Sequence, residues 1–63
     1  MDLPSHAWAV VPLLEDSDEE VRFEAVRTLR KLEPAALAQY AVAVAARLED
    51  SDAQVRMSAA KTM

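Results

Sequence analysis

The stretch Leu14-Glu15-Asp16-Ser17-Asp18, followed by Val21-Arg22, occurs twice in this chain of 63 residues. Its second copy, 34 residues later, is Leu48-Glu49-Asp50-Ser51-Asp52 followed by Val55-Arg56. The same offset aligns residues 3–29 with residues 37–63, and thirteen of these 27 pairs are identical, which is far more than chance gives in so short a chain. A period of this length indicates stacked copies of one structural unit. We therefore divide the chain into a first unit, residues 1–33, and a second unit, residues 34–63.

Each unit is predicted to form two antiparallel helices. Apolar residues recur at intervals of three and four, as in Ala7, Val10 and Leu14 and again in the stripe from Val21 to Leu32. We expect helices over about residues 3–15 and 18–32 in the first unit, and over about residues 35–48 and 52–63 in the second. The expected fold class is all-α, with four helices in two hairpins.

The helix boundaries carry their own signals. Ser17 and Glu20 have the spacing of a capping box, and Ser51 and Gln54 repeat it. Pro12 is expected to kink the first helix because it lacks an N–H group and crowds the preceding turn. A second proline, Pro34, is expected to end the helix before it, since the residue before proline disfavours helical backbone angles.

Composition excludes several function classes. Eleven acidic residues against seven basic ones give a net charge of -4, which argues against nucleic acid and anionic membranes as partners. Without cysteine the chain has no disulfides, and without glycine it has no phosphate-cradling loop. The sequence shows no basic and apolar leader and no apolar segment long enough to span a membrane, so a cytoplasmic location is expected.

No catalytic, cofactor or metal site is predicted. A calcium loop starting at Asp16 would need glycine at its sixth position and glutamate at its twelfth, where this chain has Val21 and Arg27. His6 is the only histidine, and its neighbour Ser5 has no recognisable third group to complete a catalytic set. The acidic tract is expected instead to lie at a helix N-terminus, where the helix dipole stabilises negative charge. We therefore expect that the protein is not an enzyme and that it binds no cofactor.

The repeated pattern resembles the HEAT repeat. The resemblance rests on Leu13-Leu14-Glu-Asp-Ser-Asp18, then Val21-Arg22, Ala25, Leu29 and Leu32, and on the matching residues from Arg47 to Ala59. The unit length of 34 residues is short for a HEAT repeat and is closer to that of the HEAT-like units in phycobilisome lyase relatives. The resemblance implies an α-solenoid segment and a ladder of polar contacts between units, formed by Asp18, Arg22, Asp52 and Arg56. The second unit ends at Met63, before a counterpart of the first unit's Arg30-Lys31-Leu32.

One face of the second helices is a candidate protein-binding surface. Opposite the apolar stripe lie Phe23, Arg27 and Arg30, and their repeat partners Met57 and Lys61 extend the same columns of apolar and basic residues. In HEAT-like solenoids this side lines the inner, concave surface, and arginine beside an aromatic residue is typical of interface anchors. The alternative is an ordinary solvated face with one exposed aromatic residue. Trp8 is expected to pack in the core or between units, and otherwise to contact another chain.

These observations predict a non-catalytic protein-interaction or scaffold module. Repeat folds usually need three or more units, so we expect self-association through exposed ends or membership of a larger array. An accessory or regulatory subunit of an enzyme complex is the alternative. A bilin-handling protein would need a pocket that two hairpins can hardly enclose.

Overall fold

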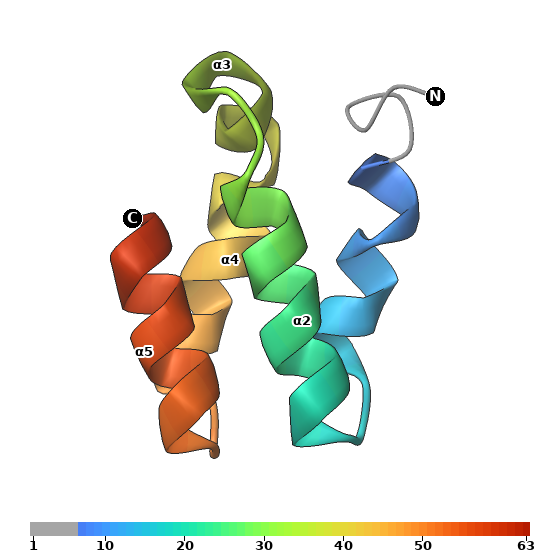
Figure 1. Cartoon of the computed structure of the whole chain (residues 1–63), viewed down its shortest axis with the longest axis vertical. Helices are drawn as coiled ribbons and strands as arrows, with labels where there is room; N and C mark the ends of the chain where they lie inside the picture. The colour runs from blue at the N-terminus through green and yellow to red at the C-terminus, as the bar shows by residue number, and fades with distance from the viewer. Residues whose placement is uncertain (1–6) are drawn as a thin grey trace.

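The computed structural model describes residues 7–63, and helices are the only regular secondary structure in this part of the chain (Figure 1). The all-α prediction is thus confirmed, with four helical segments and no strand among the described residues. The segments cover residues 7–15, Glu19–Arg30, residues 34–49 and Ala53–Thr62. The predicted start of the first helix, together with Ser5 and His6, lies outside the described residues.

The first segment is helical over residues 7–15, within the predicted range, but it is a pair of short 3₁₀ helices instead of one continuous helix. Helix η1 covers Ala7–Ala9 and η2 covers Val11–Glu15. Pro12 sits in the first turn of η2, where its missing N–H costs nothing but prevents an α-helix from running through from η1. The expected irregularity at Pro12 is therefore present, as a change of helix type.

The two long helices lie where the sequence places them. Helix α2 covers Glu19–Arg30 and helix α5 covers Ala53–Thr62. Their N-caps, however, are Asp18 and Asp52, and the capping-box prediction for Ser17 and Ser51 is wrong. The Asp18 carboxylate accepts from the Glu20 N–H at 2.8 Å, and the Asp52 carboxylate accepts from the N–H groups of Gln54 and Val55. A carboxylate at this position also interacts favourably with the helix dipole.

The third segment is a helix interrupted by 3₁₀ turns. It consists of α3 (Pro34–Leu37), η3 (Ala38–Tyr40), α4 (Ala41–Ala46) and η4 (Arg47–Glu49). Pro34 occupies the first turn of α3, as its fixed backbone angle favours. The chain bends at Tyr40, whose backbone angles (φ -114°, ψ 10°) leave the helical range.

The core lies between the segments. Helix α2 packs against η2, α5 packs against α4, and α2 lies beside α5 (Figure 1). Leu29, Val26 and Val44 are fully buried in this core. The core cluster is Ala7, Leu14, Ala25, Val26, Leu29, Leu32, Val44 and Ala59. Trp8 does not join it: its exposed fraction is 67%, so the prediction that Trp8 packs in the core is wrong, and Val42, its counterpart in the second unit, is also exposed.

Candidate functional site

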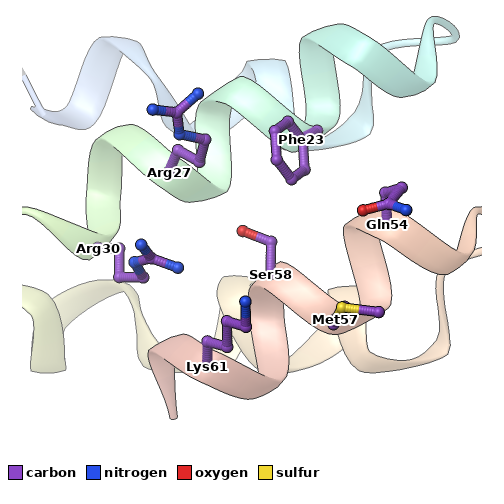
Figure 2. Close-up of a pocket in the computed structure, with 7 residues that line it drawn as sticks. All are labelled: Phe23, Arg27, Arg30, Gln54, Met57, Ser58 and Lys61. Atoms are coloured by element: carbon purple, nitrogen blue, oxygen red, sulfur yellow. The ribbon is translucent and has the colours of Figure 1, made fainter.

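A groove runs between α2 and α5, and all five residues of the predicted binding face line it (Figure 2). Its volume is about 170 Å³. The lining residues are Phe23, Arg27 and Arg30 from α2, and Gln54, Met57, Ser58 and Lys61 from α5. We call this the α2/α5 groove.

Helical spacing explains why these side chains meet. Phe23, Arg27 and Arg30 are separated by four and three residues, so they form one stripe along α2. Met57 and Lys61 are four residues apart on α5 and form the facing stripe. The neighbouring stripes of both helices point into the core, as fully buried Val26 and Ala59 show. Packing of α2 beside α5 therefore leaves these two stripes on either side of an open groove.

The groove is positively charged and partly apolar. Arg27, Arg30 and Lys61 contribute three cations, and the lining contains no carboxylate. The guanidinium of Arg27 lies 5.8 Å from the centre of the Phe23 ring, within the range of a cation–π contact. Arg27 also pairs with Glu24 at 3.3 Å on the open surface, where such a pair is weak. Met57 is half exposed and adds an adaptable apolar surface.

Ser58 is the unusual member of this lining. Its side chain points from α5 toward α2 (Figure 2) and the residue is only 4% exposed. Its Oγ is buried and has no hydrogen-bond partner among residues 7–63. Buried hydroxyls nearly always have a partner, because leaving one without costs free energy. The groove thus contains an unused polar group beside three cations.

The sequence interpretation missed two lining residues, Gln54 and Ser58. A signal for them was available, because Gln54, Ser58 and Lys61 follow one another at helical intervals of four and three. Their repeat counterparts, Glu20 and Glu24, are acidic, so Gln54 and Ser58 do not belong to the apolar and basic columns that the two units share.

The contact between the two units centres on Arg22 and Asp50. The Arg22 guanidinium donates from Nε and Nη2 to the two carboxylate oxygens of Asp50, at 2.8 and 3.0 Å. Both side chains are largely buried, with exposed fractions of 11% and 2%. Arg47 adds a third donor to Asp50 at 3.2 Å and also donates to the Leu14 carbonyl in the first unit.

Burial of Asp50 alone would raise its pKa, but the hydrogen bond from Arg22, the N–H of Asp52 and the nearby charges of Arg22 and Arg47 outweigh burial, and the pKa is lowered. The pKa of Arg22 is raised by its hydrogen bond to Asp50, against the opposing effect of burial. Both groups therefore stay charged at neutral pH.

The predicted ladder of Asp18, Arg22, Asp52 and Arg56 differs from this arrangement. Only Arg22 reaches the other unit with its side chain, and its partner is Asp50. Asp18 and Asp52 cap their own helices, and Arg56 donates to the Asp50 carbonyl at 2.6 Å within its own turn. Asp50, the first aspartate of the second Asp-Ser-Asp tract, lies just before α5 and is the one positioned between the units.

Residues 7–63 hold no cluster of three or more side chains suited to a metal ion. In the same part of the chain no helix combines the length and apolar character needed to cross a membrane. Comparisons with family models, curated proteins and solved structures gave no match to this chain.

Proposed function

We propose that this protein is a non-catalytic protein-binding module of HEAT type, and that its α2/α5 groove binds an acidic segment of another protein. The observation that carries the proposal is the groove's lining: three cations, no carboxylate and a buried serine hydroxyl without a partner. The repeated hairpins are, in this proposal, two units of an α-solenoid, with Arg22 and Asp50 joining them.

Charge selects the class of partner. A carboxylate entering the groove would lie near the cations of its lining, Arg27, Arg30 and Lys61, and charge-assisted hydrogen bonds are stronger than neutral ones. The same carboxylate can accept a hydrogen bond from Ser58 Oγ if this buried side chain turns toward the groove on binding, and that bond would remove the cost of burying the hydroxyl alone. Phe23 and Met57 then provide apolar contact for a neighbouring side chain of the partner.

Size selects the kind of ligand. Pockets for small molecules usually have volumes of roughly 300–1,000 Å³, larger than this groove. A volume of about 170 Å³ suits one or two side chains of a longer segment. The lining side chains are spread along both α2 and α5 (Figure 2), so a segment bound here would lie along the two helices.

The proposal is tested with a fluorescein-labelled peptide in which glutamate and leucine alternate. A matched peptide with lysine in place of every glutamate is the ligand control. Fluorescence anisotropy is expected to show binding of the acidic peptide only. Replacing both Arg27 and Arg30 by glutamine should weaken binding by about five- to tenfold, because each partly exposed ion pair contributes up to about 1 kcal/mol.

The matched control variant is Lys31→Gln, which removes one exposed positive charge outside the groove. It should leave the affinity almost unchanged. Equal binding of both peptides would contradict the proposal. A loss of binding free energy in Lys31→Gln that is half the loss in the double variant, which removes two charges, would show that only net charge matters and would also contradict it.

A further inference from the structure

The two ends of the molecule carry matching halves of the contact that joins its two units. In that contact, Arg22 of the first unit binds Asp50 of the second. Their repeat counterparts, 34 residues apart, are Arg56 in the second unit and Asp16 in the first. Among residues 7–63, neither Arg56 nor Asp16 has an ion-pair partner in another unit.

The turns around these two residues have the same geometry as the occupied contact. Arg22 Nη1 donates to the Asp16 carbonyl at 2.7 Å, and Arg56 Nη1 donates to the Asp50 carbonyl at 2.6 Å. The carboxylates of Asp16 and Asp50 each accept from the N–H two residues later, at 2.8 and 2.9 Å. Arg56 and Asp16 are therefore held in the poses that Arg22 and Asp50 use to bind each other.

The apolar residues at the two ends also correspond to those of the contact between the units. Val44, Val55 and Ala59 of the second unit are fully buried, and the first unit lies against the helices that carry them. The counterparts of the two valines, Val10 and Val21, are only half buried. With Leu13, which is 43% exposed, they line a second groove of about 320 Å³ between η2 and α2. The first unit therefore exposes an apolar surface. The corresponding surface of the second unit is covered by the first unit.

The charged residues around the groove between η2 and α2 favour a second copy of this chain as its binding partner. Within the molecule, Ser58 of α5 and Arg27 of α2 line the same groove between units. The counterpart of Ser58 is Glu24, and the counterpart of Arg27 is Lys61. A second copy stacked in the same register would therefore bring its exposed Glu24 to Lys61 of the first copy, as well as its Asp16 to Arg56. Both contacts pair opposite charges.

We infer that copies of this protein stack head to tail, with the η2/α2 end of one copy docked on the α4/α5 end of the next. The inference rests on the proposed stacking of the two units, but not on the ligand of the α2/α5 groove. Because the two docking surfaces differ, each added copy leaves the same two ends free, and assembly continues beyond a dimer.

Sedimentation velocity over the micromolar to millimolar range tests this inference. The wild-type weight-average mass should rise with concentration past that of a dimer. Glu24→Lys and Lys61→Glu should each weaken association by about tenfold or more, because each places like charges together. An equal mixture of the two variants should restore association, since every junction between them again pairs opposite charges. Glu33→Lys, an exposed reversal outside both surfaces, is the control and should associate like the wild type.

Asp16→Asn tests the second pair separately, because asparagine keeps the oxygen that caps the turn and removes the charge. It should also weaken association. A wild-type monomer at all concentrations, a mass that stops at the dimer, or a mixture that stays monomeric would overturn the inference.

Peptide binding separates this inference from the proposed function. Glu24→Lys keeps every lining residue of the α2/α5 groove and removes the carboxylate that pairs with Arg27, so this variant should bind the acidic peptide at least as tightly as the wild type. A monomeric wild type that binds the peptide overturns the stacking alone. An associating wild type that ignores the peptide overturns the groove proposal alone.

Discussion

Arg22 and Asp50 form a bidentate ion pair across the boundary between the two units, with donor–acceptor distances of 2.8 and 3.0 Å. The residues are 28 positions apart in the chain, and both are largely buried. Arg47 reaches the same carboxylate from the second unit. The pair therefore links α2 of the first hairpin directly to the turn before α5 of the second.

Asp50→Ala should lower the free energy of unfolding by roughly 2 to 3 kcal/mol, because it leaves the guanidinium of Arg22 buried without its partner. Arg22→Lys should cause a smaller loss, since lysine keeps the charge but cannot form the two parallel bonds. Urea denaturation followed by circular dichroism measures both. A loss in Asp50→Ala no larger than in Asp16→Ala, the counterpart at the open end, would contradict the importance of this pair.

Acid should weaken the fold through Asp50. Its folded-state pKa lies below the ordinary value of 3.8, so its contribution to stability is complete well above that pH and is lost as the pH falls through the folded-state pKa. The stability difference between wild type and Asp50→Asn should therefore be constant near neutral pH and shrink below about pH 4. Urea midpoints measured from neutral to acidic pH test this. A difference that grows on acidification would show that the sign is wrong.

The helix caps predict a contrast between neighbouring residues. Asp18→Ala and Asp52→Ala should each cost about 1 kcal/mol, because each removes the acceptor for an N–H group of the first helical turn. Ser17→Ala and Ser51→Ala should change the unfolding free energy by less than about 0.5 kcal/mol. Thermal or urea unfolding of the four variants decides between the aspartates and the serines as the caps. A larger loss of unfolding free energy in Ser17→Ala and Ser51→Ala would show that the serines cap the helices, as in a capping box.

Ser58→Ala should affect stability and binding in opposite directions. It removes a buried hydroxyl without a partner and places the best helix former in α5, so the free energy of unfolding should rise by up to about 1 kcal/mol. The same change should weaken binding of the acidic peptide, because a hydrogen-bond donor is lost from the groove. Ala60→Ser, an exposed change on the same helix, is the control for helix propensity. If Ser58→Ala is neutral for binding, the hydroxyl takes no part in recognition.

Sequence reasoning located α2 and α5 well because an acidic tract ending in an aspartate cap precedes each helix and a basic residue lies in the last turn of each. It did not predict the helix type at residues 7–15, where the proline and the short helical turns give 3₁₀ geometry that apolar spacing cannot distinguish from an α-helix. It also missed the bend at Tyr40, which has no glycine or proline beside it to signal a break.

The candidate site, too, could be predicted from the sequence only in part. The face of Phe23, Arg27, Arg30, Met57 and Lys61 could be found from the sequence because each unit contributes one regular helical stripe to it. The choice of Asp50 over Asp18 and Asp52 as the partner of Arg22 could not, because it depends on how the hairpins pack. The position of Ser58 on this face had a signal in the sequence, but its burial did not, since burial arises only when α2 lies beside α5.

The most direct test of the central claim is a chemical-shift titration of the isotope-labelled protein with the alternating glutamate–leucine peptide. Our account predicts that amide shifts concentrate at the groove residues, above all Phe23, Arg27, Ser58 and Lys61, and that they disappear with the lysine peptide. Shifts that centre on the exposed residues Trp8 and Val42, or that spread evenly over the surface, would contradict the claim that the α2/α5 groove is the binding site.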